Sequence, residues 1–301
     1  MTTAEHSTGD GFGDAYIGLS DEDGDGRWAY GTGFDDPLAG VDTAVPDGID
    51  GAALATYCLM LGDDALIYSQ RLQEWVTHAP ELEEETALAN IALDLLGQAR
   101  LLLSRAGSAD GSGRDEDRLA FFRSKEEFRN VRLVERSDKD FAELVCRLLI
   151  FATWRLAACE ALRGSRDPVL AAVATSAVKE LSYHRDYAAR WVIRLGAGTP
   201  TSHDRAQAAL EAGWPDVDAL FCPHPIETGL VGVAVDPGRL RAAFDATLRP
   251  VLSAATLRLP DAAPHARVDG RSGRDGVHTE EFGPLLAEMQ SVARTHPDAT
   301  W

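Results

Sequence analysis

The stretch LVCRLLIFATWRLAA, residues 144–158, decides the fold class. It forms the middle of a helix that we expect over residues 140–163, and its apolar side chains surround the helix instead of forming one stripe. A helix that is apolar on every side is buried in a large bundle or at a subunit interface. The rest of the chain must therefore supply several helices to cover it.

Three other long segments have helical periodicity. The first runs over residues 52–77, and the second begins at Pro80, with an acidic first turn, and continues to residue 105. The fourth runs from Pro168 to residue 195, and shorter helices are expected at 203–221, 237–257 and 280–294. No segment shows convincing strand alternation apart from short apolar stretches near residues 230–235. The expected class is all-α, a four-helix bundle with additional C-terminal helices.

The chain divides near residue 50. Residues 1–50 are acidic and rich in Gly and Asp, so we expect a disordered extension there and a helical domain over 51–301. Asp21, Asp23 and Asp25 match the start of an EF-hand loop, but the twelfth position is Thr32, so a solvated acidic loop is favoured. The Gly-rich run 107–117 is expected to be a flexible connection.

The net charge of the chain argues against two classes of partner. The formal net charge is −19, which argues against nucleic acid or an anionic membrane as a partner. Nearly all the positive charge is arginine, and this acidic, lysine-poor composition suggests a halophilic source. Equal stability at low and at molar salt would contradict that hypothesis.

The remaining bulk features indicate a cytoplasmic protein. No stretch approaches the ~20 apolar residues that a membrane-spanning helix requires, and residues 1–14 do not resemble a signal peptide. The four cysteines are widely spaced, and three of them lie among apolar residues. Small core side chains are therefore expected in preference to disulfides or zinc ligands.

The segment KELSYH, residues 179–184, resembles half of a metal site. Di-iron and di-manganese bundles take a Glu-x-x-His pair from each of two helices and a carboxylate from each of the other two. Here Glu180 is followed three residues later by Tyr183, and His184 arrives one residue late. A shift of one residue turns the imidazole by about 100° around the helix axis, so it cannot take the same ligand direction.

The other three helices also lack part of the ligand set. The first helix offers Asp63 or Asp64, while on the second Asp94 is followed by Gly97 and Gln98 where a histidine would be needed. The central polar residue of the third helix is Arg147. We therefore expect a vestigial metal site that holds no metal, with positions Asp63, Asp94, Gln98, Arg147, Glu180, Tyr183 and His184.

Arg147 has an electrostatic interpretation in that site. Carboxylates buried in a dismantled metal site require a counter-charge, so Arg147 is expected to bridge Asp94 and Glu180. Tyr183 would then fill the space left by the imidazole, and His184 would be a structural or interface residue. Two alternatives are that Asp94 and Glu180 merely face solvent, and that an atypical di-metal site still works.

Several long motifs resemble one known family. SQRLQEWVTHAPELEEETALANIALDLLGQAR (69–100), SRDP (165–168), KELSYH (179–184) and GVHTEEFGPLLAEMQ (276–290) are similar to the PaaC family. Its members are the C subunits of bacterial and archaeal ring-1,2-phenylacetyl-CoA epoxidase. The resemblance covers residues 52–301, including the terminal Trp301, and leaves the extension outside.

The resemblance implies a ferritin-like fold and a place in a multicomponent monooxygenase of phenylacetate catabolism. In that complex an A subunit carries the di-iron centre and epoxidises phenylacetyl-CoA with oxygen, and a small B subunit helps assembly. A reductase with FAD and an iron-sulfur centre delivers electrons from NADPH. The C subunit has lost the metal ligands and supports the A subunit, so no cofactor and no catalytic residue are expected in this chain.

A weaker feature precedes the last helix. Arg271, Arg274 and His278 lie before a helix for which Thr279 is a candidate N-cap, and such a cluster suits the phosphates of a coenzyme A ester. Simple solvation of a loop is the favoured alternative. Three functions thus remain open: a structural subunit of the oxygenase complex, an independent di-metal oxidase or ferritin-like iron protein, and a binding module for acyl-CoA esters.

Overall fold

A computed structural model describes residues 37–265 and 269–299. Within these residues the regular structure is helical, and no β-strand element occurs. The chain is therefore all-α, as the sequence predicts. The α-helices are α1 (Gly51–Glu74), α2 (Leu82–Ala109), α3 (Glu116–Phe121), α4 (Phe141–Leu162), α5 (Pro168–Gly196), α6 (Pro200–Gly213), α7 (Pro225–Gly229), α8 (Arg241–Ala254) and α9 (Phe282–Thr295).

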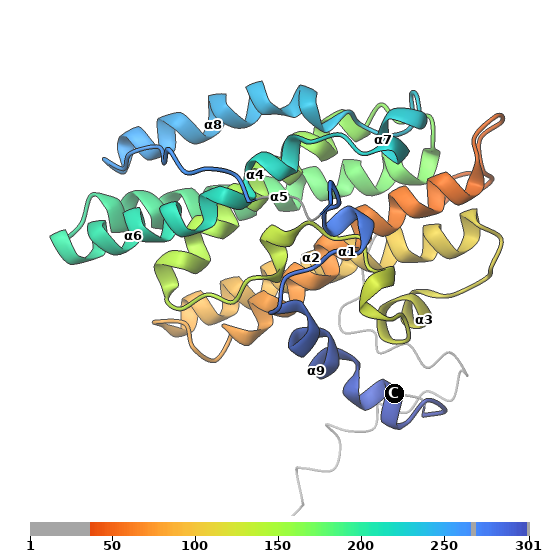
Figure 1. Ribbon diagram of the computed structural model, residues 1–301, viewed down its shortest axis with the longest axis horizontal. Helices are drawn as coiled ribbons and strands as arrows, with labels where there is room; N and C mark the ends of the chain where they lie inside the picture. The colour runs from red at the N-terminus through yellow and green to blue at the C-terminus, as the bar shows by residue number, and fades with distance from the viewer. Residues whose placement is uncertain (1–36, 266–268, 300–301) are drawn as a thin grey trace, which may run out of the picture. The chain divides into compact units, whose positions relative to one another are not determined.

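The four long helices form the bundle. Helix α1 packs along α2, α4 packs along α5, and α2 also contacts α5 (Figure 1). Tyr68 of α1 and Phe151 of α4 meet with their ring centroids 4.5 Å apart, which joins the two pairs through the core. Helices α6 and α8 pack against α4 and α5, and α9 packs against α3. Helices α1 and α4 are buried on nearly all sides, as the apolar sequence of α4 predicts.

Local capping sets the starts of three bundle helices. Asp50, Asp140 and Asp167 each accept a hydrogen bond from a backbone N–H in the first turn of α1, α4 and α5. An Asp at this position satisfies a donor that would otherwise lack a partner, which is worth about 1 kcal/mol. Pro168 occupies the first turn of α5, where its missing N–H costs nothing.

The boundaries of the first helix pair differ from the prediction. Helix α1 ends at Glu74 because residues 75–78 form hydrogen-bonded turns. Helix α2 starts at Leu82, so Pro80 precedes it instead of occupying its first position. It continues to Ala109 and includes Gly107, where an added Cβ would lie 1.7 Å from the carbonyl oxygen of Arg114. The expected flexible connection, residues 107–117, therefore begins as part of α2. The chain after α2 then turns back and packs closely against the end of that helix.

The C-terminal helices are shorter and more interrupted than their periodicity suggests. The predicted helix 203–221 is α6 followed by two 3-10 turns, and the predicted helix 237–257 is a 3-10 turn followed by α8. The short helices α3 and α7 have too few residues to show a period. The cap of α9 is Glu281, and the N–H of Thr279 donates instead to Glu135.

Residues 37–50 belong to the helical unit, which begins at Pro37. Four apolar side chains of this segment pack against the core, and the Arg105 guanidinium donates to the carbonyls of Thr43 and Ala44. The helical unit therefore starts earlier than the boundary expected at residue 50. The EF-hand-like stretch, residues 21–32, lies outside the described residues.

The structure bears on two expectations drawn from the composition, one about the cysteines and one about membrane-spanning helices. Cys58, Cys146 and Cys159 are buried free thiols and Cys222 is exposed, so the expected core cysteines are confirmed. Helix α2 is long and apolar enough to span a membrane by length and composition alone, a feature that the sequence pattern did not predict. In the described structure 44% of its apolar stretch is buried by the bundle.

Candidate functional site: a polar cluster between the bundle helices

Five polar side chains from three helices meet inside the bundle. Asp94 and Gln98 come from α2, Arg155 from α4, and Glu180 and His184 from α5. We call these five residues the polar cluster. Helix α1 takes part through the backbone carbonyl of Leu61. All four bundle helices are therefore tied to one hydrogen-bonded network.

Within the polar cluster, two hydrogen bonds join α2 to α5. His184 Nε2 lies 2.9 Å from Asp94 Oδ2, and Gln98 Nε2 donates to Glu180 Oε2 at 2.8 Å. On each helix the two residues are four apart, so they lie about one turn apart on the same side. Because the two helices run in opposite directions, each residue of one pair faces a residue of the other.

This geometry explains the position of the histidine in KELSYH. A histidine three positions after Glu180 would share a metal ion with Glu180. His184 lies four positions after Glu180 and instead reaches Asp94 on α2. His184 is buried, with 1% of its side chain exposed, while 37% of the Asp94 side chain is exposed. The histidine therefore joins the two helices from inside the bundle.

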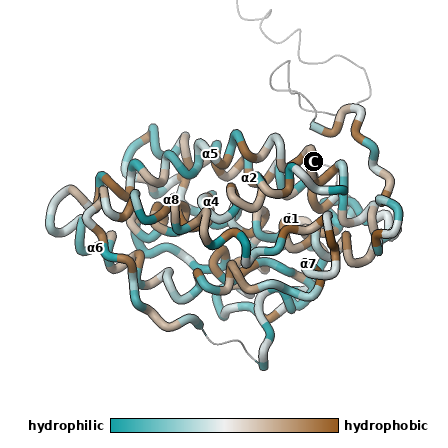
Figure 2. Tube along the Cα trace, turned by 90° about the horizontal axis from the view of Figure 1, so that it is seen from above, coloured by the Kyte–Doolittle hydropathy of each residue, from teal (hydrophilic) through white to brown (hydrophobic). Residues whose placement is uncertain are grey.

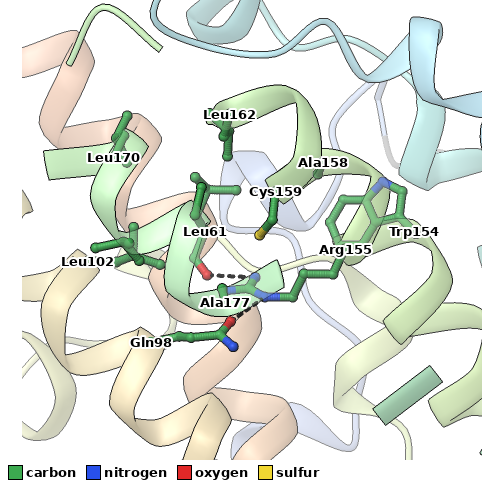
Figure 3. Close-up of a pocket in the computed structure, with 12 residues that line it drawn as sticks. Leu61, Gln98, Leu102, Trp154, Arg155, Ala158, Cys159, Leu162, Leu170 and Ala177 are labelled. Carbon is green, nitrogen blue, oxygen red and sulfur yellow. Dashed lines mark hydrogen bonds between the residues drawn. The ribbon is translucent and has the colours of Figure 1, made fainter. Parts of the chain in front are cut away.

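Arg155 provides the positive charge of the cluster. Its Nε donates to Gln98 Oε1 at 3.0 Å and its Nη1 donates to the carbonyl of Leu61 at 3.1 Å, as the dashed lines in Figure 3 show. The residue is 3% exposed. Gln98 connects the charges, because its amide oxygen accepts from Arg155 while its amide nitrogen donates to Glu180. A planar amide performs both roles at once, which a carboxylate cannot.

Burial affects the charge of Glu180. Its side chain is half-buried, and this burial raises the pKa of the carboxyl above its ordinary value. The hydrogen bond from Gln98 acts in the opposite direction, and the nearby charge of Asp94 adds to the increase in pKa. The charged carboxylate of Glu180 is therefore less stable in the folded chain than in water.

Replacing Glu180 with glutamine is expected to stabilise the chain at pH 8 and to have little effect at pH 4. Since the pKa is raised on folding, the folded chain holds more protons than the unfolded chain between the ordinary value, about 4.3, and the raised value. Stability associated with this carboxyl is present below that window and falls as the pH rises through it. Urea unfolding at both pH values measures the difference.

The matched control for this experiment is Glu160→Gln, which changes an exposed glutamate of α4. It should leave the urea midpoint unchanged at both pH values. A Glu180→Gln variant that is less stable than the original chain at pH 8 would show that the Glu180 charge is favoured by its surroundings, against this account.

The expected role of Arg147 is wrong. Its guanidinium pairs with Asp138 and donates to the carbonyl of Arg136, so it does not bridge Asp94 and Glu180. The cation near those carboxylates is Arg155, two turns further along α4. The need for a buried arginine could be predicted, but not which one, because the register of α4 against its neighbours depends on packing.

Two other expected positions lie outside the cluster. Tyr183 is 55% exposed, so it does not fill the place of an imidazole; the buried residue at this point of α5 is His184. Asp63 is fully buried and pairs with Arg123, and it also accepts from the N–H of Arg129. Asp94, Gln98, Glu180 and His184 are brought together as a set, as the sequence predicts.

The residues proposed to contact coenzyme A phosphates have internal partners. Arg274 donates to both carboxylate oxygens of Asp64, at 3.0 and 2.8 Å, and to the carbonyls of Met60 and Arg129. His278 Nδ1 lies 2.7 Å from Glu135 Oε1, and both side chains are fully buried. Of the three residues, Arg271 is exposed. Arg274 and His278 therefore fix the segment before α9 to the bundle and are not available to a phosphate.

The surroundings of Arg274 favour the charged form of its guanidinium. Burial acts to lower the pKa of its guanidinium, but the charges of Asp64 and Glu227 outweigh burial, so the pKa is raised above its ordinary value. The sequence offered no signal for this contact, since Asp64 and Arg274 are 210 residues apart.

The polar cluster does not fit a di-metal centre. In the part of the chain that the structure describes, no three His, Cys, Asp or Glu side chains are grouped to hold an ion. Gln98 and Arg155 are buried, and Gln98 already donates to Glu180 while Asp94 is hydrogen-bonded to His184. A guanidinium repels a cation, so these residues are suited to hold each other instead of iron.

The space beside the cluster is too small for a substrate. A cavity of about 20 Å³ lies next to Arg155 and is lined mainly by apolar residues such as Leu61, Leu102 and Ala177 (Figure 3). Such a volume holds about one water molecule. An aromatic acyl group could not enter it without rearrangement of the helices.

Two comparisons with known proteins identify the family of this chain. Residues 43–301 match the family described as "Phenylacetic acid catabolic protein". The chain is also 44% identical over 250 residues to the C subunit of 1,2-phenylacetyl-CoA epoxidase from Escherichia coli strain K12. That match covers 82% of this chain and 99% of the relative. The chain belongs to the phenylacetic acid catabolic protein family.

Proposed function

We propose that this chain is the non-catalytic C subunit of a phenylacetyl-CoA epoxidase. The observation that carries the proposal is the hydrogen-bonded chain of Arg155, Gln98 and Glu180, because it puts an amide where the ligand pattern needs a histidine and adds a guanidinium beside it. The polar cluster then serves to align the four helices. The name of the E. coli relative supports the assignment to this complex.

The chemistry of the proposed complex takes place in other chains. A homologous di-iron subunit would epoxidise phenylacetyl-CoA with oxygen and would bind most of the substrate. A small B subunit would support assembly, and a reductase with FAD and an iron-sulfur centre would supply electrons from NADPH. The proposal places this complex in the cytoplasm, with neither a nucleic acid nor a membrane as a partner.

Mixing the purified chain with the di-iron subunit is expected to produce a stable heteromer on size-exclusion chromatography. Epoxidation of phenylacetyl-CoA should require both chains, and inactivating substitutions should map to the partner. Glu180→Gln in this chain should leave the turnover rate of the assembled complex unchanged. If the two chains elute separately, or if this chain alone epoxidises the substrate, the proposal is wrong.

A further inference from the structure

The segment that leads into α9, residues 272–281, lies directly against the connection between α3 and α4. We call this segment the latch. A Cβ added at Gly273 would lie 2.1 Å from the carbonyl oxygen of Asn130, and one added at Gly276 would lie 2.3 Å from that of Glu126. The two backbones therefore approach too closely for a side chain at either point.

The connection between α3 and α4 presents a fully buried carboxylate, that of Glu135, to the latch. Asn130 Nδ2 donates to its Oε1 at 2.8 Å, the N–H of Thr279 donates to its Oε2 at 2.6 Å, and His278 Nδ1 lies 2.7 Å from Oε1. A set of donors around both oxygens favours the ionised carboxylate. A buried negative charge of this kind requires a positive partner.

Both ring nitrogens of His278 face oxygen atoms. Nδ1 faces Glu135 Oε1, and Nε2 lies 3.3 Å from the carbonyl oxygen of Phe128. Because both oxygens act as acceptors, a neutral ring would place one nitrogen lone pair against an acceptor. The imidazolium donates at both positions and supplies the positive charge that Glu135 requires. The side chain is fully buried, so bulk water cannot replace either hydrogen bond.

The other charged groups around His278 come from three elements. Glu126, an exposed carboxylate of the 3-10 turn in the α3–α4 connection, faces the ring. Arg71 of α1 donates through Nε and Nη2 to the backbone carbonyl of Glu135, at 2.9 and 2.6 Å. From α9 the Phe282 ring packs against the imidazole, with the ring centroids 4.2 Å apart. The carboxylate of Glu135 is therefore the direct ionic partner of the ring.

The latch also attaches α9 to the rest of the chain. Arg132 Nε donates to the carbonyl of Val277 at 3.1 Å, and Glu281 Oε2 accepts from the N–H and the hydroxyl of Ser137. Helix α9 packs mainly against α3 and the 3-10 turn Lys125–Glu127, and it lies beside the four long helices in Figure 1. A latch that opens would therefore loosen α9 without disturbing the bundle.

We infer that residues 272–281 form a proton-sensitive latch, held closed by the imidazolium of His278 paired with Glu135. When the ring loses its second proton, Nε2 no longer donates to the carbonyl of Phe128, and the buried carboxylate loses its counter-charge. The stability that this pair gives the latch is present at low pH and is lost as the pH rises through the value at which the folded ring titrates. This inference does not depend on the proposed function.

A second histidine contacts the latch and has the opposite preference. His224 Nε2 lies 3.2 Å from Asp275 Oδ1, while its Nδ1 accepts from the N–H of Ile226 at 3.2 Å. A ring that accepts at Nδ1 is neutral, so a rise in pH cannot weaken this contact. Loosening of the latch on raising the pH would therefore come from His278.

Nitrogen NMR of the full chain labelled with ¹⁵N-histidine measures the protonation of His278 directly. The signals of its ring are those that are missing from the spectrum of His278→Gln. We expect both ring nitrogens to carry a proton at neutral pH, and one proton to leave at higher pH while the chain stays folded. A neutral ring at neutral pH overturns the inference, and so does a ring that stays charged until the whole chain unfolds.

Amide hydrogen exchange measures the opening of the latch. Above the pH at which the ring titrates, the protection factors of residues 272–295 should fall by about tenfold or more, because a hydrogen bond between charged groups is lost. The protection of α4 should not change. His278→Gln, whose neutral amide can still donate to Glu135, should lower the protection of the same residues at neutral pH. Equal protection in the two chains, or equal loosening of α4, would show that there is no such latch.

Two further variants complete the test. His203→Gln is the matched control: His203 Nδ1 lies 2.8 Å from the carbonyl oxygen of Gly196, and its helix α6 lies at the opposite end of the helical unit from α7 (Figure 2). It should leave the protection of the latch and α9 unchanged. In Glu135→Gln the ring of His278 should titrate at a lower pH than in the original chain, since its ionic partner is gone. An unchanged titration would show that Glu135 does not hold the charge, against the inference.

Discussion

Replacing Arg274 with methionine is expected to lower the free energy of unfolding by about 3–5 kcal/mol. The substitution leaves the Asp64 carboxylate fully buried without its guanidinium, and it also removes the donor to the carbonyls of Met60 and Arg129. An uncompensated buried charge is more costly than the loss of an exposed ion pair. Equilibrium unfolding in urea measures the change.

The exposed neighbour Arg271 supplies the control. Arg271→Met should change the unfolding free energy by less than about 0.5 kcal/mol, since surface substitutions of this kind have small effects. Calorimetry with phenylacetyl-CoA should give the same signal for the original chain and for Arg271→Met. If Arg274→Met keeps full stability but loses binding of the CoA ester, Arg274 is a ligand contact and its structural role is wrong.

Replacing Arg155 with methionine is expected to destabilise the chain by about 2–4 kcal/mol. The substitution leaves Gln98 Oε1 and the Leu61 carbonyl without this donor in the core, and it removes a positive charge that favours the Glu180 carboxylate. A triple replacement of Gln98, Arg155 and Glu180 by leucine should recover part of the loss, because an apolar core of similar volume requires no partners.

A double-mutant cycle distinguishes Arg155 from Arg147. Combining Arg155→Met with Gln98→Leu should give a coupling of about 1–3 kcal/mol, since the two side chains are hydrogen-bonded. The same cycle with Arg147→Met should couple by less than about 0.5 kcal/mol, because Arg147 pairs with Asp138 instead. If Gln98 couples more strongly to Arg147 than to Arg155, the arrangement inferred from the sequence, with Arg147 in the site, is right.

The long helices could be predicted because their signals are local. The helix expected over residues 140–163 is Phe141–Leu162 in the structure, and both the apolar sequence and the Asp140 cap lie within the expected range. Pro80 misled the prediction of α2, since a proline suits the first turn of a helix but also suits the turn before it. The 3-10 turns after α6 depend on packing and leave no period in the sequence.

The polar cluster could be predicted in part. Asp94 and Gln98 share one side of α2, and Glu180 and His184 share one side of α5, so helical spacing alone groups each pair. The choice between Arg147 and Arg155 depends on how far α4 slides along its neighbours, and eight residues correspond to about 12 Å. Nothing in the sequence of α4 specifies that shift.

The measurement that tests the central claim most directly is the iron content of the purified chain, expressed alone in iron-supplied cells. We expect well under one iron per chain, and no change in that value when Glu180 is replaced by alanine. Two irons per chain that are lost on the Glu180→Ala substitution would show that the cluster of Asp94, Gln98, Arg155, Glu180 and His184 is a working metal site, and would contradict its role as a metal-free link between the helices.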